Sequence, residues 1–150
     1  MRGVPPASDC GRDGVPALAL ELPATISGLV RALESLDQCA AERQLDRAAV
    51  IRLRIVIEEL VTNTIKYGYG GECAQSVRLR LFLGERTELI YEDAAPGFDP
   101  LAWHACWKAE ARAPDGGIGR QGIPLILGFA SEVRYQPLTQ GNRLILTMKP

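Results

Sequence analysis

The residues whose types and spacing could do chemistry stand near the middle of the chain, in the stretch 55–69. Glu59 and Asn63 are four residues apart, and Lys66 and Tyr67 follow one turn later. Residues at this spacing are neighbours on one side of an α-helix. The stripe would therefore carry a carboxylate, an amide and an amine, and it could line a pocket. The alternative is a solvated helix face, because a Glu-x-x-x-Asn pair is common in helical proteins.

The helix that must position this stripe has clear signals of its own. Asp46 is expected to cap its first turn, since a short carboxylate accepts a hydrogen bond from an otherwise unpaired N–H group. Gly68 or Gly70 is expected to end it. Between these ends, apolar residues recur at spacings of three and four, which is typical of a helix with one face on a core. They are Val50, Leu53, Ile57, Leu60, Val61 and Ile65.

Length and composition favour one globular domain at 15–150 after a flexible tail at 1–14. With 150 residues, 47% of them hydrophobic, the chain can bury a core. The tail is rich in proline, glycine and small polar residues and has no periodicity. A formal charge of -1 offers no overall attraction to nucleic acid or to an anionic membrane, so neither is expected as a partner.

The four cysteines and the one histidine limit which metal and redox sites the chain could form. The cysteines contain no C-x-x-C pair, so they suggest neither a zinc site nor a redox motif and are expected to be reduced thiols. His104 is the single histidine, which excludes a metal site built from several histidines. No stretch has the length and hydropathy of a bilayer span or of a signal peptide, so we expect a cytoplasmic protein.

The remaining pattern predicts the other elements in order. They are a strand at 17–22, a helix from Thr25 to about Arg43, strands at 75–83 and 87–92, a long loop at 94–119 with a short helix at 101–113, a helix at 123–129, and strands at 133–136 and 144–148. Strands in pairs with helices between them indicate an α+β fold, a two-layer α/β sandwich with helices on one face of a mixed, mainly antiparallel sheet.

Two features between these elements need an interpretation. A loop as long as 94–119 inside a compact domain is usually either disordered or a functional lid. Arg78 and Arg80 alternate with apolar residues along the strand at 75–83. We expect both to be solvated on the wet face of the strand rather than to bind phosphate.

Three stretches rich in acidic, amide and glycine residues follow one another: ELVTN at 59–63, DAAPGFDP at 93–100 and GGIGRQG at 116–122. Their order and spacing resemble the ATP site of the GHKL superfamily, which includes gyrase, Hsp90, histidine kinases and MutL. Within it, the chain most resembles the RsbW-type anti-sigma factors, which are also serine/threonine kinases. The matching segments are EELVTNTIKYG, EDAAPGFDP, GIPLI followed by SEVRY, and GNRLILTMK. The resemblance covers about residues 17–149 and implies the Bergerat fold of these ATPases, with an ATP lid.

The resemblance also implies roles for individual residues. Glu59 would be the catalytic base that orients or deprotonates the attacking serine hydroxyl. Asn63 would offer its amide oxygen to Mg²⁺ beside the phosphates. Asp93 would accept a hydrogen bond from the amino group of adenine. Lys66 could face phosphate, and a surface lysine is the alternative.

Glycines near the lid would complete the nucleotide site, because glycine lets the backbone approach a ligand closely and a helix N-terminus favours phosphate. They are Gly97, Gly117, Gly119 and Gly122. Arg120, or less readily Arg112, could reach the γ-phosphate and spread the charge of the transition state. Both could equally be solvated lid residues.

Two departures from the family pattern bear on nucleotide binding. The family motif reads Asp-x-Gly, whereas this chain has Ala95 at the glycine position and Gly97 two residues later. If that position needs a positive φ, alanine is strained there and ATP binding is weakened. The glycine box is also shifted, with Arg120 at its usual first glycine and Gly117 and Gly119 nearby.

The resemblance implies an ATP-dependent serine/threonine protein kinase and anti-sigma factor of a partner-switching system. It would bind a sigma factor and phosphorylate a STAS-domain antagonist on serine, with ATP and Mg²⁺, and a homodimer is expected. Ala95 and Arg120 favour an alternative, a degenerate GHKL module that sequesters a partner without phosphoryl transfer. A detached sensor-kinase ATPase ranks last, because the chain lacks a phosphoacceptor histidine box and a dimerisation helix.

Overall fold

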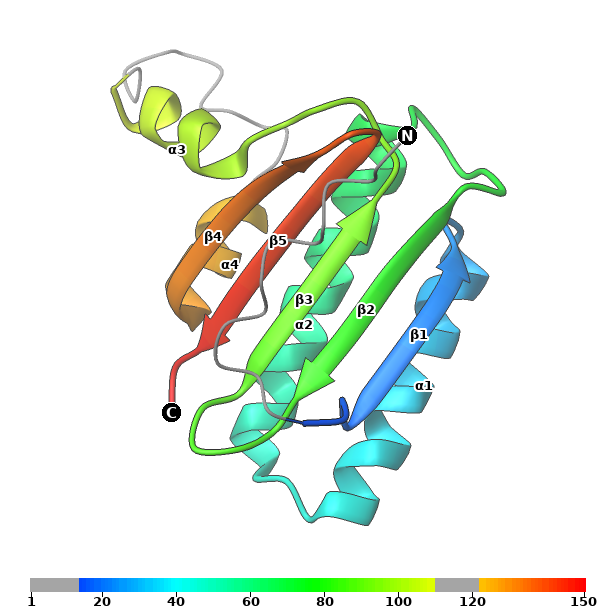
Figure 1. The fold of residues 1–150 in the computed structure, drawn as a ribbon, viewed down its shortest axis with the longest axis vertical. Coiled ribbons are helices and arrows are strands. Elements are labelled where there is room, and N and C mark those ends of the chain that lie inside the picture. The colour runs from blue at the N-terminus through cyan, green and yellow to red at the C-terminus, as the bar shows by residue number, and fades with distance from the viewer. Residues whose placement is uncertain (1–13, 110–121) are drawn as a thin grey trace.

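A five-stranded sheet carries helices on one of its faces in the computed structural model, which describes residues 14–109 and 122–150 (Figure 1). The strands are β1 (Leu18–Pro23), β2 (Ser76–Phe82), β3 (Glu88–Asp93), β4 (Ala130–Leu138) and β5 (Gly141–Met148). The helices are α1 (Ile26–Arg43), α2 (Arg47–Asn63), the π-helix η1 (Thr64–Gly68), α3 (Pro100–Ala109) and α4 (Gly122–Phe129).

The strands lie in the order β1-β2-β3-β5-β4, and every pair in the described residues is antiparallel. Helices α1, α2 and α4 lie behind the sheet in Figure 1, so none of them covers the face toward the viewer. The predicted α+β sandwich with a mainly antiparallel sheet is confirmed. The central pairing of β3 with β5 sets Asp93 opposite Asn142, which joins two distant parts of the chain.

Both long helices begin where the sequence predicts. The Gly28 N–H donates to the Thr25 hydroxyl oxygen at 2.9 Å, which caps α1. The Ala49 N–H donates to the Asp46 carboxylate at 3.3 Å, which caps α2. These caps satisfy N–H groups that no carbonyl inside the helix can reach.

The helical run that starts with α2 ends at Gly68, as predicted, but the type of its last turn differs from the prediction. Instead of running on regularly to Gly68 or Gly70, α2 ends at Asn63 and widens into the π-turn η1. The Tyr69 N–H donates to the Thr64 carbonyl at 2.8 Å, and Gly70, with φ of 73°, turns the chain away. A π-turn of five residues is too short to show its own period in the sequence.

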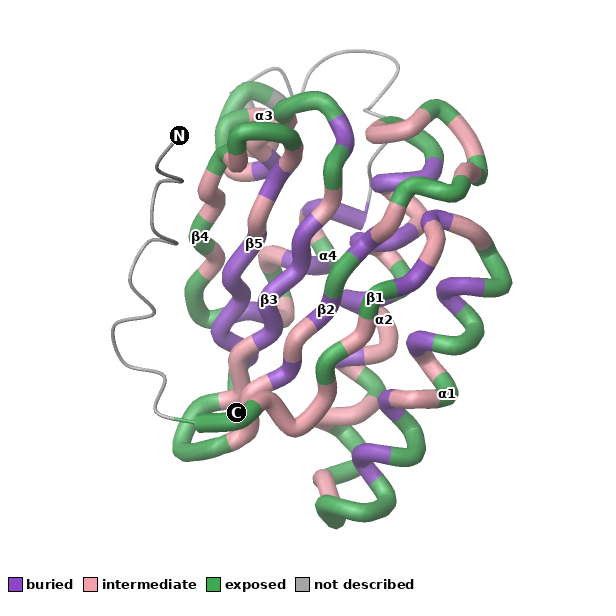
Figure 2. The backbone as a smooth tube through the Cα atoms, turned by 45° about the vertical axis from the view of Figure 1, so that its right-hand side comes forward, coloured by how far each residue is buried: buried purple, intermediate pink, exposed green. Residues whose placement is uncertain are grey.

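The core lies between the sheet and α1, α2 and α4, where buried segments of both layers face each other (Figure 2). Apolar residues of α2 at the predicted spacing are buried there, except that Val50 is only half-buried. Alternate residues of β2 contribute the opposite layer. The most buried of these side chains are Leu53, Ile57, Val61, Val77, Leu79 and Leu81.

The last two strands are longer than predicted. β4 includes exposed Ser131 and Glu132 at one end and Pro137 at the other. It is an edge strand, so proline costs no hydrogen bond on its outer side and polar residues can face water. A register shift between Ala130 and Glu132 also breaks the alternation that the prediction relied on.

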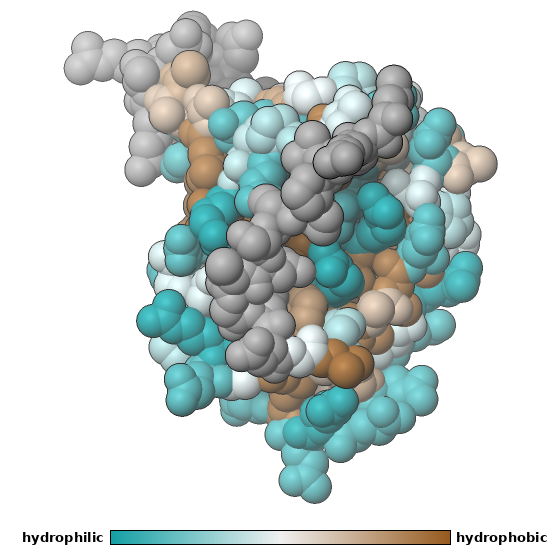
Figure 3. Space-filling view, in the orientation of Figure 1, coloured by the Kyte–Doolittle hydropathy of each residue, from teal (hydrophilic) through white to brown (hydrophobic). Residues whose placement is uncertain are grey.

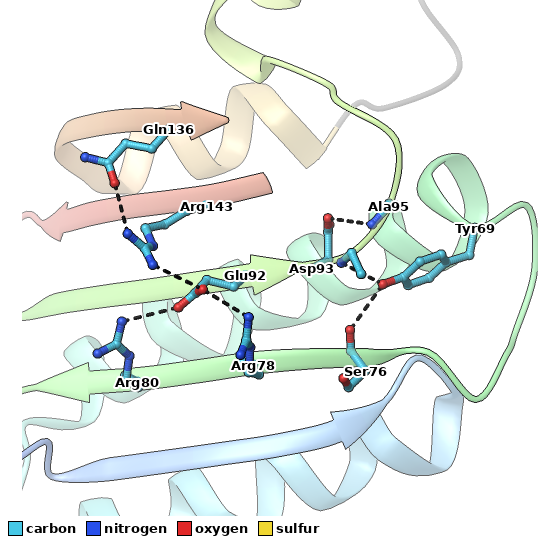
Figure 4. A network of polar contacts seen from close by, with 10 residues as sticks. Tyr69, Ser76, Arg78, Arg80, Glu92, Asp93, Ala95, Gln136 and Arg143 are labelled. Carbon is cyan, nitrogen blue, oxygen red and sulfur yellow. Dashed lines mark hydrogen bonds and ion pairs between the residues drawn. The ribbon is translucent and has the colours of Figure 1, made fainter. Parts of the chain in front are cut away.

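Arg78 and Arg80 are partly solvated, as expected, but both also contact a carboxylate that the sequence did not predict as their partner. Arg78 Nη2 lies 3.3 Å from Glu92 Oε2, and Arg80 Nη2 lies 3.2 Å from Glu92 Oε1. Arg143 on β5 adds a third contact at 3.4 Å to the same carboxylate (Figure 4). Glu92 lies opposite Arg78 on one side and Arg143 on the other, so strand register alone brings this cluster together.

The cluster lies on the face of the sheet without helices, where hydrophilic residues cover much of the surface among apolar ones (Figure 3). No helix within residues 14–109 and 122–150 has the length and hydropathy needed to cross a membrane. Of the cysteines in these ranges, Cys39, Cys73 and Cys106 are free. The predicted tail, apart from Gly14, and residues 110–119 of the predicted lid lie outside the described residues.

Candidate nucleotide-binding site

A cavity opens at the end of the sheet where β3 stops, between α2, η1, α4 and the loop that leads to α3. It is partly open to solvent, and the space inside it together with its mouth is roughly 730 Å³. Its walls are largely apolar, with side chains such as Leu60, Ile123, Ile126 and Leu144. The polar side chains that line it include Asn63, Thr64, Asp93 and Asn142.

The helix stripe predicted from sequence meets this cavity in part. Asn63 and Tyr67 line it, together with Thr64. Lys66 does not line it, and its side chain is exposed. In a helix three to four residues separate neighbours on one face, so the cavity face of α2 continues through the wide turn of η1 while Lys66 points elsewhere.

Asp93 stands at the last position of β3 and is held by three donors. Its Oδ1 accepts from the Ala95 N–H at 3.1 Å and from the Asn142 side-chain amide at 2.9 Å. Its Oδ2 accepts from the Thr64 hydroxyl at 2.9 Å. The contacts come from a loop, a strand and a helix, so the carboxylate has one orientation toward the cavity.

Two tyrosines support this arrangement. The buried Tyr91 hydroxyl lies 2.5 Å from the Thr64 hydroxyl, and burial raises the pKa of Tyr91 well above its usual value, so it stays protonated. Tyr69 accepts from the Ala94 N–H at 2.8 Å and donates to the Ser76 carbonyl at 3.2 Å (Figure 4). Partial burial likewise raises the pKa of Tyr69. Together they fix the start of the loop after Asp93.

The strain expected at Ala95 is absent. Among the described residues only Gln44 combines a side chain with a positive φ, so Ala95 adopts an ordinary backbone conformation. Its methyl group is 2% exposed and lines the cavity. A Cβ on Gly68 would lie only 2.8 Å from that of Ala95, so glycine in η1 leaves the space that this methyl group occupies.

Gly97 contributes less than expected. It is exposed, has no positive φ and does not line the cavity, although its neighbours Pro96 and Phe98 do. Gly117, Gly119, Arg120 and the alternative Arg112 lie outside the described residues. Their predicted roles stay predictions.

Glu59 lies beside the cavity rather than in its wall. It sits one turn before Asn63 on α2 and packs against Gly122, the first residue of α4. A Cβ at position 122 would overlap the carboxylate and lie 3.0 Å from Glu59 Cβ, so glycine there lets the Glu59 side chain keep its position. The carboxylate therefore stands near the N-terminal end of α4, where unpaired N–H groups favour an anion.

Three residues around Asp93, namely Asn142, Thr64 and Tyr69, were not predicted from the sequence. Asn142 stood inside the segment GNRLILTMK, but nothing local marks it as a partner of Asp93. The pairing of β3 with β5 provides that contact, and such a register cannot be derived from either strand alone. Thr64 is the first residue of the π-turn and Tyr69 follows its last residue, and the sequence did not predict this turn.

Comparisons with known proteins agree with this geometry. A family model described as the histidine kinase-like ATPase domain matches residues 22–148. The chain belongs to this family. The superfamily resemblance drawn from the three stretches is thereby confirmed, and ATP is the ligand that the description of this domain implies.

Two solved structures share the fold. One contains the RsbU and RsbW domains of Rv1364c from Mycobacterium tuberculosis, with a TM-score of 0.57 and 19% identity over 88% of this chain and 32% of that chain. The other is the SiaB–SiaC complex from Pseudomonas aeruginosa, with a TM-score of 0.58 and 15% identity over 87% of this chain and 89% of that chain. At these identities, the two structures show that the fold is shared. No curated protein sequence matches the chain significantly.

The residues present suit Mg²⁺ held together with a nucleotide. Residues 14–109 and 122–150 contain no group of three His, Cys, Asp or Glu side chains that could bind a metal. Asn63 nevertheless brings a neutral oxygen ligand to the cavity. Mg²⁺ prefers oxygen, keeps several waters and is commonly bound through few protein groups plus phosphates, so this donor set fits it.

Proposed function

We propose that the chain binds ATP with Mg²⁺ in this cavity and transfers the γ-phosphoryl group to a serine of a STAS-domain antagonist. It would also bind a sigma factor, act as a homodimer and work in the cytoplasm. The observation that carries the proposal is that Asn63 and Asp93, from separate motifs, line one largely apolar cavity. Membership of the ATPase family and the fold shared with an RsbW domain support it.

The adenine ring would lie between the apolar walls of the cavity, with its amino group toward Asp93. Leu60 and Ile126 from the helices and Leu144 from β5 offer such walls. Burying an aromatic ring against apolar surface provides most of the affinity, while one hydrogen bond selects the base.

The phosphates would extend toward Asn63 and the start of α4. The amide oxygen of Asn63 would hold Mg²⁺, which when bound neutralises phosphate charge. Gly122 and the residues of the glycine box would leave backbone N–H groups open to phosphate. Gly117, Gly119 and Arg120 stay in the proposal as residues near the phosphates or the lid, whereas Lys66 and Gly97 do not line the cavity.

The transfer itself would use Glu59. The oxygen of the partner's serine forms a bond to the γ-phosphorus, and the bond from that phosphorus to the bridging oxygen of ADP breaks. The serine proton passes to the Glu59 carboxylate, and ADP leaves. Positioning and charge neutralisation supply most of the acceleration in such reactions, and the base adds to them.

One observation favours a second candidate, a binding module without phosphoryl transfer. Glu59 packs against Gly122 and does not line the cavity. A carboxylate in that position could stabilise the packing of α4 on α2 and never meet a substrate. The two candidates differ in the fate of the phosphoryl group and share the ATP site.

Calorimetric titration of Mg-ATP into the wild type and into Asn63→Ala tests the shared part. We expect binding to the wild type and a loss of about tenfold or more in the variant, because the metal loses its amide ligand. A wild type that does not bind ATP would rule out the kinase.

Phosphate transfer to an unphosphorylated STAS-domain partner then separates the two candidates. Glu59→Gln keeps the shape of the side chain and removes its basicity, so it should bind ATP normally and transfer at least a hundredfold more slowly. Equal transfer rates for Glu59→Gln and the wild type would exclude Glu59 as the base. Absence of phosphoserine with the wild type would favour the binding module.

A further inference from the structure

Asn142 is the most extensively bonded polar side chain beside the cavity. It is the second residue of β5, is 8% exposed and stands opposite Asp93 in the sheet. Its Nδ2 donates to Asp93 Oδ1 at 2.9 Å and lies 3.3 and 3.2 Å from the carbonyl oxygens of Ala95 and Pro96. A single amide thus bridges the end of β3 and the loop that follows it.

The other end of the same amide is equally occupied. Asn142 Oδ1 accepts from the Phe98 N–H at 2.8 Å and from the Tyr135 hydroxyl at 2.6 Å. These partners fix which end of the amide is which, because the reverse orientation would set its oxygen against three other oxygens. The donor nitrogen must therefore point at Asp93.

Three of the four acceptor positions of the Asp93 carboxylate are consequently filled. Asn142 and Ala95 take both positions on Oδ1, and the Thr64 hydroxyl takes one on Oδ2. The donors in the part of the chain that the structure describes leave a single position on Oδ2. All three protein donors are neutral, so the carboxylate keeps its full charge and its capacity to attract one further donor.

We propose that Asn142 is a positioning residue for base recognition: by occupying Asp93 Oδ1, it directs the one free acceptor of the carboxylate at an exocyclic amine of the ligand. This inference rests on the proposed ATP site and specifies how that site selects adenine. A base with a carbonyl oxygen at the same place would set this oxygen against the carboxylate oxygen, and both are acceptors. A desolvated site rejects such a base.

Asn142 does not touch the base in this arrangement, since its two N–H groups and its oxygen are already used. Its effect on base recognition passes through Asp93, whose rotamer it holds. A merely structural role would weaken the binding of any nucleotide. A positioning role weakens the binding of nucleotides that carry the amine and leaves others nearly unchanged.

The test compares ATP with purine riboside triphosphate, which lacks the amino group and is otherwise the same. The wild type should prefer ATP by about tenfold, the worth of one hydrogen bond to a charged acceptor. In Asn142→Asp the donor is lost and a second carboxylate repels Asp93, so the preference should fall to about one through weaker ATP binding. Binding of the analogue should change by less than about threefold.

Val133→Ala is the matched control, because Val133 also lines the cavity but has no part in the Asp93 network. It should weaken both ligands alike and keep the tenfold preference. Tyr135→Phe removes one donor to Asn142 from a half-buried position and should reduce the preference by about threefold. This second variant tests the inference even if Asn142→Asp does not fold, which circular dichroism shows.

The outcomes separate the inference from the proposed function. A wild type that binds neither nucleotide overturns the ATP site and this inference with it. A wild type that binds both equally well keeps the ATP site and overturns the role of Asn142. An Asn142→Asp variant that folds and keeps the tenfold preference, or an unchanged preference in Tyr135→Phe, overturns the inference as well.

Discussion

Glu92 and Asp93 are consecutive carboxylates on β3, yet their surroundings are opposite. Glu92 lies on the helix-free face among the guanidinium groups of Arg78, Arg80 and Arg143. Asp93 lies on the helix side at the cavity, and its donors within residues 14–109 and 122–150 are all neutral. Charge neutralisation makes Glu92 a structural anchor, whereas neutral partners leave Asp93 charged and able to bind one more donor.

These two residues show that a carboxylate's role follows from what already occupies its oxygens. A count of acidic residues would treat the two alike. The ion pairs of Glu92 connect β2, β3 and β5 across the sheet, so replacing Glu92 should lower stability. The hydrogen bonds of Asp93 connect the sheet to the cavity, so replacing Asp93 should weaken ligand binding.

The largest expected effect is at Asp93. Asp93→Asn keeps the size of the side chain, but its amide has fewer acceptor positions and sets N–H groups against the present donors. ATP affinity should fall by about a hundredfold or more, because a buried site that loses its acceptor rejects the amine. Calorimetry measures the loss, and a change of less than about threefold would contradict the role of Asp93 in recognition.

Glu92 should show the opposite profile. Glu92→Gln leaves three guanidinium groups without their anion, and Arg143, with only 17% of its side chain exposed, cannot turn fully to water. The free energy of unfolding should fall by about 2 kcal/mol, less than for a fully buried pair since Arg78 and Arg80 are partly solvated. Urea denaturation measures it.

Glu132→Gln is the control for this change, because Glu132 and Arg134 form a pair at 3.7 Å that is more than half exposed on both sides. It should cost no more than about 0.5 kcal/mol. ATP affinity should stay within about twofold in both variants. A tenfold loss of ATP affinity in a folded Glu92→Gln would remove the distinction between the two carboxylates.

Glu59, which packs against Gly122, is a third carboxylate to compare, and it lies on the helix side of the sheet. Gly122→Ala places a methyl group into the Glu59 carboxylate, so this side chain must move. The transfer rate should fall by about tenfold with a smaller change in ATP affinity, since misplacing a base affects the chemical step more than binding. Single-turnover phosphorylation measures it.

Gly128→Ala, in the same helix, is the matched control. A Cβ there meets nothing within 4 Å, so the change should raise stability by about 0.5–1 kcal/mol and leave transfer unchanged. If both alanine variants transfer equally fast, the close contact at Gly122 has no catalytic meaning.

The smallest expected effects are losses of stability in variants of the arginines that contact Glu92. Arg78 has 55% of its side chain exposed, so Arg78→Ala should cost about 0.3 kcal/mol or less. Arg143 is mostly buried and also donates to Gln136 at 3.3 Å, so Arg143→Ala should cost about 1 kcal/mol. Equal losses in thermal denaturation would show that burial does not rank these ion pairs.

Much of the fold could be predicted because the signals are local. Thr25 and Asp46 cap their helices as expected, since a cap depends on the few residues that follow it. The ends of β4 could not be predicted, because an edge strand accepts Ser131 and Pro137, which sequence rules assign to loops. The turn η1 was not predicted, because one wide turn changes the spacing of the apolar residues very little.

The candidate site divides in the same way. Asn63 and Asp93 were found through their motifs, and both line the cavity. Thr64 and Asn142 were not found, although they hold Asp93 in place, because their contacts span separate elements. Their importance follows from hydrogen-bond partners rather than from residue type.

By itself, the sequence determined where most helices and strands lie and which of their faces are buried. These follow from periodicity and caps, which act over a few residues. Only the tertiary structure decided that three arginines surround Glu92 and that Asn142 meets Asp93. It also decided that Gly68 makes room for Ala95. Strand register and helix packing set those contacts, and both are properties of the assembled layers.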